Sequence, residues 1–370
     1  MIILPDRSEL RARVLMPVHR REWRDLTRFR GVARSNDGCV IWQGWFDDRD
    51  DCDAFIFAMA RGSLRWEREL QRLPTPEWRP DFADLSYEFF GTSFITSTSS
   101  TNQSDSVPSD WNNGNNWIDA VAGGGSGGNQ YSGSNQQQVV VGGGGGAWSR
   151  TNNVALTPGG TATFFLPPAA GAPTINSGGS TGGDVWYNGA TLAASSVGAK
   201  GGAGGGHNFG TGITVGGSPG GASASGVGGV KYSGGASGSA TNTSALPSVS
   251  ASGGGGAAGL HGVGGASRST GNNDSSGGGV GDAGFGGSGG GTGNNGSEYD
   301  STHGCGGGGL GGLTSQSNVA PGGLYGGGGG GCATNVALAG PNAGAQGMIV
   351  KNYLLAASGL TGFNMPMLGL

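Results

Sequence analysis

The chain has 370 residues, of which 85 are glycine, and a formal net charge of −4 at pH 7. Of its 44 charged residues (20 basic, 24 acidic), 31 lie in the first hundred positions, where 15 arginines face 16 carboxylates. This near balance leaves no basic face of the kind that nucleic-acid binding needs. No apolar run reaches the ~18 residues of a transmembrane helix, so we expect neither a nucleic-acid partner nor a membrane span.

Residues 1–100 have an ordinary composition and predict a small α+β domain. Residues 39–46 are rich in β-branched and aromatic side chains and predict a strand, as do residues 85–96. Residues 52–62 follow a cluster of aspartates and end in glycine, which is typical of a helix. A second, arginine-rich helix is expected over residues 61–72.

Four arginines of this second segment, Arg61, Arg65, Arg68 and Arg72, have two interpretations. They form a face that docks on another protein, or they lie on a solvated helix with Arg–Glu pairs along it.

The acidic run 47–53 resembles a calcium loop only in charge. It lacks the central glycine and final glutamate of an EF-hand, so we expect an acidic turn and no metal site.

A polar segment over residues 101–110 predicts a linker, and residues 356–370 form a C-terminal tail. Between them, residues 111–355 are glycine-rich but contain short apolar runs, each of which predicts a strand. These runs are Trp117–Ile118, Val139–Val141, Thr161–Leu166, Val185–Tyr187 and Met348–Val350. The residues 154–157 and 161–166, on either side of Pro158-Gly159-Gly160, predict a hairpin.

Glycine occurs in eight runs of three or more residues, at 123–125, 142–146, 204–206, 253–256, 277–279, 289–291, 306–309 and 326–331. Such a segment is either a flexible linker or a structure packed through its backbone. The apolar runs argue against a linker, and the contiguous glycines exclude collagen, which needs glycine at every third position. Because bare backbones can approach closely enough to hydrogen-bond, we expect packed polyglycine-II helices, short strands and little α-helix after residue 100.

Two motifs mark the ends of this region. The opening motif is Val107-Pro108 followed by Asp110-Trp111-Asn112, a strand over 117–121 and the run Gly123–Gly128. The closing motif is Gly344-Ala345-Gln346-Gly347 followed by Met348-Ile349-Val350. Together with the internal segments Gly322–Gly326 and Gly296–Asp300, these motifs resemble the glycine-rich domain of bacteriophage tail-fibre and virion proteins. The resemblance covers residues 107–353.

The resemblance implies a non-enzymatic virion protein, assembled in the host cytoplasm. We expect residues 1–100 to dock on tail, neck or capsid proteins, while the glycine-rich domain recognises a host-surface glycan or protein. A purely structural decoration of the particle is the alternative. A secreted cell-wall protein fits poorly, because the start shows no signal-peptide pattern. The oligomeric state stays open, a homo-oligomer included.

Aromatic residues of the glycine-rich region are the candidate receptor contacts. Trp148, Tyr187 and Tyr232 would bind sugar by stacking if they lie exposed at one end, and would favour a structural role if buried. For Trp186 burial is the expected state. No catalytic constellation, cofactor motif or zinc spacing is present, although Asp282, Glu298 and Asp300 could supply a carboxylate pair.

Cys305 and Cys332 each lie at the edge of a glycine run. If the two runs are antiparallel neighbours, the cysteines lie at the same level, close enough for a disulfide or at least for proximity. The alternative is a pair of buried thiols that pack as small hydrophobic groups.

Overall fold

The computed structural model describes residues 10–14, 23–34, 40–46, 65–76, 87–131, 137–210, 212–243, 248–291, 293–313, 319–334 and 342–354. Side chains are described from residue 91 onward. The chain divides into two compact units. The first comprises residues 1–91 and 354–370, and the second comprises residues 92–353.

The described residues of the first unit form β-strands. The strand β2 (Trp23–Arg34) is the centre of an antiparallel sheet, with β3 (Val40–Phe46) and β4 (Arg65–Pro76) on its two sides. The strand β1 (Leu10–Val14) pairs with the first half of β5 (Tyr87–Ile95). The strands predicted at 39–46 and 85–96 are therefore confirmed.

The helix predicted over residues 61–72 is wrong from residue 65 onward, because Arg65, Arg68 and Arg72 lie on β4. This strand pairs with β2 along its whole length of 12 residues. Such a long-range ladder overrides a local helix preference. Since β4 is an edge strand, it also accommodates two prolines. Arg61, the acidic run 47–53 and the helix predicted at 52–62 lie outside the described residues.

The second unit consists of short strands joined by extended segments, and its described residues contain no α-helix. The strands are β6 (Gln103–Ser106), β7 (Asn116–Val121), β8 (Asn129–Tyr131), β9 (Gln138–Val140), β10 (Trp148–Asn152), β11 (Thr161–Phe165), β12 (Val185–Tyr187), β13 (Val197–Ala199), β14 (His207–Phe209), β15 (Ile213–Val215), β16 (Val230–Tyr232), β17 (Ala240–Asn242), β18 (Val249–Ala251), β19 (Asp274–Ser275), β20 (Cys332–Thr334) and β21 (Met348–Leu354). The 3-10 turns are η2 (Leu192–Ala194), η3 (Ser223–Ser225) and η4 (Asp282–Gly284). Little α-helix after residue 100 was predicted, and this is confirmed.

The apolar runs of the glycine-rich region form strands as predicted, and the first and last of them pair with each other. β7 runs antiparallel to β21, from Val121 opposite Met348 to Asn116 opposite Tyr353. β10 pairs with the other side of β7, and β16 with β10. The two ends of the glycine-rich region are thus closed against each other by a ladder of backbone hydrogen bonds.

The predicted hairpin over residues 154–166 is wrong, although its turn exists. Gly160 N–H bonds the Thr157 carbonyl at 2.9 Å, and Gly159 has a φ of 71°. The partner strands of β11 are instead β6 and β12, in a sheet ordered β13-β12-β11-β6. The segment predicted as a polar linker, 101–110, therefore contributes a strand to the second unit. Its alternating exposure suits a strand at the edge of a sheet.

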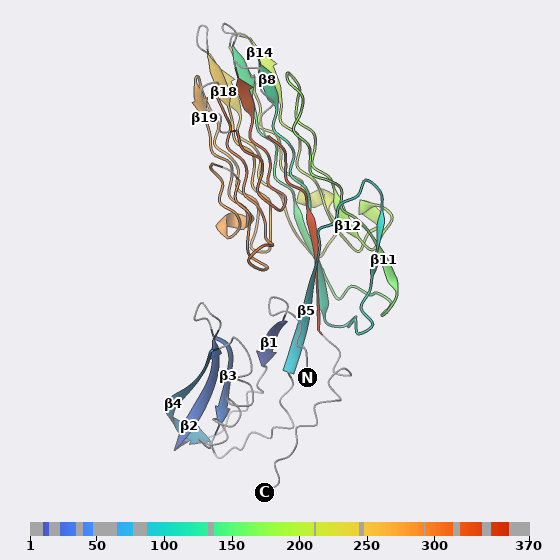
Figure 1. Cartoon of the computed structure of the whole chain (residues 1–370), viewed down its shortest axis with the longest axis vertical. Helices are drawn as coiled ribbons and strands as arrows, with labels where there is room; N and C mark the ends of the chain where they lie inside the picture. The colour runs from blue at the N-terminus through green and yellow to red at the C-terminus, as the bar shows by residue number, and fades with distance from the viewer. Residues whose placement is uncertain are drawn as a thin grey trace. The chain divides into compact units, whose positions relative to one another are not determined.

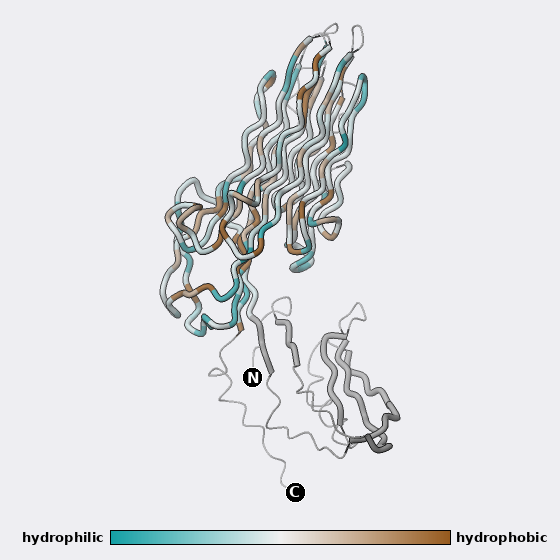
Figure 2. Tube along the Cα trace, turned by 180° about the vertical axis from the view of Figure 1, so that it is seen from behind, coloured by the Kyte–Doolittle hydropathy of each residue, from teal (hydrophilic) through white to brown (hydrophobic). Residues whose placement is uncertain are grey.

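Glycine runs lie side by side in what we call the glycine bundle (Figure 1). It comprises segments 122–129, 140–147, 177–183, 200–206, 217–221, 233–238, 252–258, 263–267, 276–281, 305–312, 320–323, 326–332 and 342–347. Figure 2 shows long stretches of near-neutral hydropathy there, interrupted by short hydrophobic patches. The segments are held together by hydrogen bonds between backbones rather than by side chains.

Hydrogen-bond donors within a bundle segment follow a repeat of three residues. Segment 123–129 shows the repeat in full. Toward segment 177–183, Gly123, Ser126 and Asn129 donate to Gly183, Ser180 and Ser177. Toward segment 342–347, Gly124 and Gly127 donate to Ala345 and Asn342, and toward segment 140–147, Gly125 and Gly128 donate to Gly144 and Val141. Each neighbour is therefore met once per three residues, and its acceptors also step by three. A flat strand, whose donors alternate between two sides, cannot produce this pattern.

Segment 140–147 illustrates the packing that results. It donates backbone hydrogen bonds to segments 200–206 and 326–329 and to Gly235. It accepts them from segments 122–128 and 252–258 and from Gly221. A Cβ built on Gly144 would lie 2.1 Å from the Pro219 carbonyl oxygen, and one on Gly145 would lie 1.9 Å from that of Gly256. Backbone atoms of neighbouring segments surround this run, so the run must consist of glycine because no larger side chain would fit.

Serine replaces glycine at several bundle positions and supplies the hydrogen bond that the packing needs. Ser126 Oγ accepts from the Ser180 N–H at 2.8 Å. Ser252 Oγ accepts from the Gly142 N–H and donates to the Gly238 carbonyl. Both serines are buried. A hydroxyl is the smallest side chain that can donate and accept, which explains its use beside bare backbone.

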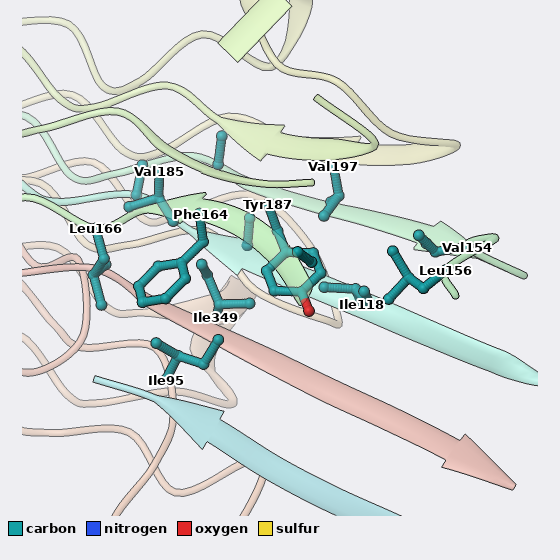
Figure 3. Close-up of a cluster of buried hydrophobic side chains, with 14 of the residues drawn as sticks. Ile95, Ile118, Val154, Leu156, Phe164, Leu166, Val185, Tyr187, Val197 and Ile349 are labelled. Atoms are coloured by element: carbon teal, nitrogen blue, oxygen red, sulfur yellow. The ribbon is translucent and has the colours of Figure 1, made fainter. Parts of the chain in front are cut away.

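Among the described residues, the buried hydrophobic clusters lie at the ends of the bundle. Figure 3 shows the largest hydrophobic cluster, where Ile118 and Ile349 of β7 and β21 meet Phe164 and Tyr187 of β11 and β12. On the opposite face of the same strands, Val121 and Met348 join a second cluster around Trp148. β7 and β21 are thus buried on both faces, and they connect the glycine bundle to both hydrophobic clusters.

We expect the alanine substitution Gly144→Ala to lower the free energy of unfolding by about 2 kcal/mol or more, because its Cβ would overlap the Pro219 carbonyl. The matched control is Gly171→Ala, where a Cβ meets nothing within 4 Å. We expect that change to stay within about 1 kcal/mol. Chemical denaturation of the two variants measures the difference. Equal stabilities would contradict close packing of the backbones.

Candidate functional site

The aromatic residues predicted to contact a receptor lie mostly inside the protein. Trp148 is 1% exposed and Tyr187 is fully buried. Tyr232 is half-buried and stacks on Trp148, with ring centroids 5.6 Å apart. The prediction of direct receptor contact is wrong for Trp148 and Tyr187. Both are on strands whose inward faces fill the two hydrophobic clusters, so burying their large rings contributes to stability instead.

Trp148 is part of a buried polar network that sequence reasoning did not identify. Arg150 donates to both oxygens of Asp119, with Nε–Oδ1 and Nη2–Oδ2 distances of 2.6 and 2.7 Å. Tyr299 Oη donates to Asp119 at 2.9 Å and accepts from Trp148 Nε1 at 2.9 Å. The Arg150 guanidinium lies over the Trp117 and Trp148 rings, 5.4 Å from each centroid.

This network braces β7, β10 and the loop at residue 299. The Asp119 carboxylate is fully buried, and burial raises its pKa, against the lowering effect of Arg150. Both Asp119 oxygens and the Tyr299 hydroxyl are engaged in hydrogen bonds, so no group is left facing a substrate. The arrangement fits a structural role, in which one bidentate ion pair aligns neighbouring strands.

A second ion pair lies near the other hydrophobic cluster. Lys351 Nζ and Tyr187 Oη both donate to Asp105 Oδ2, at 2.5 and 2.6 Å. Burial raises the pKa of Tyr187 strongly, and Asp105 adds to that effect, so the hydroxyl stays protonated and donates. The contact joins β21, β12 and β6, which come from distant parts of the sequence.

Cys305 and Cys332 are both buried, but no disulfide joins them. Gly306, Gly309 and Gly312 donate in order to Tyr325, Gly328 and Gly331, so these two runs are parallel. Cys332 accordingly lies beside Gly312. The extended chain from residue 305 to residue 312 spans roughly 20 Å, far beyond disulfide range. The predicted pairing is wrong because it assumed antiparallel runs.

Two of the candidate carboxylates, Asp282 and Glu298, do come together. Asp282 Oδ1 accepts from the backbone of His261 and Gly262, and Oδ2 lies 2.6 Å from His261 Nδ1. Glu298 accepts from the Cys305 N–H through both oxygens and hydrogen-bonds Asp282. Carboxyl groups in direct contact leave no room for the sugar that a glycosidase holds between its pair. They tie three loops together.

The pKa of Glu298 is raised to about 7, chiefly by burial and further by Asp282, while backbone donors lower it. Asp300 is separate from this pair. Burial acts to raise the pKa of Asp300, but the hydrogen bonds that it accepts from Thr302 and His303 together lower it. His303 stacks on Phe94, with centroids 3.9 Å apart.

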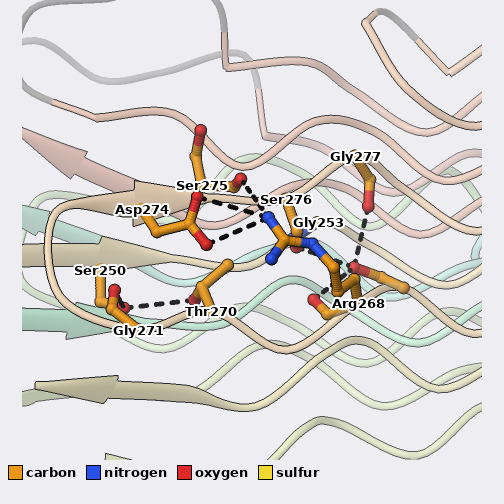
Figure 4. A network of polar contacts seen from close by, with 10 residues as sticks. Ser250, Gly253, Arg268, Thr270, Gly271, Asp274, Ser275, Ser276 and Gly277 are labelled. Carbon is orange, nitrogen blue, oxygen red and sulfur yellow. Dashed lines mark hydrogen bonds and ion pairs between the residues drawn. The ribbon is translucent and has the colours of Figure 1, made fainter.

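The end of the bundle that carries β8, β14, β18 and β19 forms a surface that we call the loop end (Figure 1). Asparagines order its described turns: Asn272 bonds the backbone and hydroxyl of Thr243, and Asn176 accepts from the Tyr131 N–H. Asn176 and Asn273 have left-handed φ angles of 58° and 54°. Figure 4 shows the adjacent network, in which Arg268 binds Asp274 and the Ser275 carbonyl.

Large apolar side chains are also exposed near the loop end. Phe209 on β14 is 38% exposed and Ile175 is 37% exposed. Polar amides with a few exposed apolar groups can contact either a protein or a sugar. The asparagines and threonines of the loop end give only a weak signal in the sequence, because Asn and Thr in glycine-rich loops are equally typical of plain turns.

Charge provides the signal that could have found the buried network. Residues 101–370 contain only five lysines and arginines, and four of them pair with an aspartate: Arg150–Asp119, Lys200–Asp184, Arg268–Asp274 and Lys351–Asp105. In a region with so few charges, each one marks a specific contact.

In the part of the chain with described coordinates, no three His, Cys, Asp or Glu side chains gather to hold a metal ion. The same residues include no helix with the length and hydropathy to cross a membrane. No family model matches the chain, and no curated protein matches it significantly.

We expect Arg150→Met to destabilise the protein by about 3–5 kcal/mol, because it leaves the buried Asp119 carboxylate without its counter-ion. The control is Arg268→Met, whose side chain is 67% exposed and whose ion pair is worth about 1 kcal/mol or less. Equilibrium unfolding in urea compares them. A similarly small loss of unfolding free energy in both variants would show that the Arg150–Asp119 pair does not stabilise the fold.

The raised pKa of Glu298 predicts a pH dependence of stability. The folded state holds this proton more tightly than the unfolded chain, so the free energy of unfolding falls as pH rises from about 4.5 to about 7. Glu298→Gln cannot ionise, and its melting temperature should fall less between pH 4.5 and pH 7.5 than that of the unmodified protein. Parallel pH profiles for the two proteins would refute the assignment.

Proposed function

We propose that the glycine runs are polyglycine-II helices packed side by side. The three-residue order of donors in segment 123–129 supports this, since a helix of three residues per turn presents every third N–H to the same neighbour. The short distances from hypothetical Cβ atoms to neighbouring carbonyls support it too. We further propose that the first hundred residues include helical structure, as their sequence indicates.

The chain, in this proposal, is a non-enzymatic bacteriophage virion protein, a tail or neck fibre or adhesin. Residues 1–100 dock on other virion proteins, and the glycine-rich unit recognises the host surface. The single observation that supports this best is the loop end. A scaffold built almost wholly from backbone holds ordered Asn turns and exposed Phe209 and Ile175 at one end. The resemblance of residues 107–353 to virion glycine-rich domains agrees with it.

A purely structural virion protein is the second candidate. The burial of Trp148 and Tyr187 favours it, because two of the three aromatics considered for receptor binding fill the interior. The two candidates differ in what they predict for cells: an adhesin binds the host surface as a purified chain, whereas a decoration protein binds only the particle.

We expect the purified full-length chain to bind host cells and to delay adsorption of the phage that encodes it. Phe209→Ser combined with Ile175→Ser should weaken cell binding roughly tenfold, as for a central contact of an interface. The control is Val230→Ser on β16, a side chain 42% exposed in the sheet beside β10. A chain that is present in virions but does not bind cells would favour the structural role.

A further inference from the structure

The outer face of the β13-β12-β11-β6 sheet carries side chains that belong to none of the buried hydrophobic clusters. Alternate residues of β11 and β12 point into the core, namely Ala162, Phe164, Val185 and Tyr187. The remaining positions face outward: Thr161, Thr163 and Phe165 on β11, Trp186 on β12, and Ser104 and Ser106 on β6.

An aromatic pair forms the centre of this face. Phe165 lies opposite Trp186 in register, and their rings stack with centroids 4.3 Å apart. Trp186 Nε1 donates to the Gly189 carbonyl at 3.2 Å, which fixes the indole orientation. Both rings are only half-buried. On the far side of Trp186 the register position is Gly198, and Leu192 of η2 packs over it. The result is a stacked aromatic pair with the apolar side chain of Leu192 beside it.

Hydroxyl groups continue the face in the other direction along the strands. Thr163 lies opposite Ser104, and Thr161 opposite Ser106. All four side chains belong to exposed residues. Each hydroxyl can donate one hydrogen bond and accept two, which matches the hydroxyls of a sugar. Because the rows lie on paired strands, their spacing is fixed before any ligand arrives.

Charge on the face is compensated. The only ion pair there among the described residues joins Lys200 to Asp184, at 2.9 Å, next to Gly198 and Trp186 in the strand register. The second Asp184 oxygen accepts from the Gly201 N–H. A face without net charge does not select an anionic or cationic ligand. Flanking hydroxyl rows are also unlike the apolar centre of a protein–protein interface.

We propose that this outer face binds a neutral saccharide, with one sugar ring packed against the exposed surface of the Phe165–Trp186 pair and with its hydroxyl groups bonded by Thr163 and Ser104. An aromatic ring presents an apolar surface to the C–H face of a pyranose, and the threonine and serine hydroxyls exchange hydrogen bonds at its edge. The inference rests on the proposed function, because it identifies the host-surface ligand as a glycan. The site that it proposes lies away from the loop end.

The test uses the full-length chain in native gels that contain a neutral polysaccharide, either dextran, galactan or glucomannan, with alginate as the anionic comparison. We expect a neutral polysaccharide to retard the chain and alginate not to do so. Trp186→Ala should weaken the retardation about tenfold or more, and Trp186→Phe should retain most of it. Thr163→Val, at an exposed position of β11 where folding is not at risk, should also weaken retardation because it removes a hydroxyl that bonds the sugar.

The control is Val230→Ser on β16, a side chain 42% exposed and outside this face, which should leave retardation unchanged. Three results would overturn the inference: retardation by alginate alone, no retardation by any polysaccharide, or retardation that Trp186→Ala and Thr163→Val both leave undiminished. Binding to host cells distinguishes a failure of this inference from a failure of the proposed function. If Trp186-dependent cell binding is lost after periodate treatment, the ligand is a glycan; if it is lost only after protease treatment, the face binds protein and the inference fails. Cell binding that needs only the loop end overturns this inference and leaves the proposed function standing.

Discussion

The second unit depends on one constraint: its backbones approach one another so closely that a carbonyl oxygen occupies the place of a Cβ. At Gly145, Gly220 and Gly278 an added Cβ would lie 2.0 Å or less from a neighbouring carbonyl oxygen. Glycine costs conformational entropy on folding and contributes no side-chain burial. The dense net of backbone hydrogen bonds between segments offsets this, because it pairs the amide groups that packing removes from water.

The same constraint explains how charge is used. A bundle of bare backbone contains few polar side chains that could stabilise a buried ion, so a charge inside it needs a dedicated partner. Asp119 has Arg150 and Tyr299, and Asp105 has Lys351 and Tyr187. Both sets of contacts lie where the β-strands join the glycine bundle. These contacts give the junction a specific geometry that hydrogen bonds between identical glycines cannot provide.

Sequence patterns predicted the strands, because the apolar runs at 117–118, 139–141, 161–166, 185–187 and 348–350 stand out against glycine. They did not predict which strands pair: β11 pairs with β6 rather than with residues 154–157. A local turn is visible in sequence, but a long-range partner is not.

The directions of the glycine runs could not be predicted either. Runs 305–312 and 326–331 are parallel, and this separates Cys305 from Cys332. In a run without side chains, no pattern of large and small residues distinguishes one direction or one register from another. For the candidate site, the Asn turns of the loop end were visible as turns, but the burial of Trp148 and Tyr187 depends on strand pairing and was not.

Identical glycines leave the alignment of the segments open, since a shift by three residues restores the same hydrogen bonds within a run. The register must therefore be fixed where the runs end. β7 and β21 do this at one end, where Val121 lies opposite Met348 directly before segment 122–129 and directly after segment 342–347. At the other end Asn342 donates to the carbonyls of Gly127 and Gly128, which no shifted register would preserve. Side chains in this protein thus act at the boundaries of the bundle, where they also meet solvent, and any ligand specificity has to be located at those same boundaries.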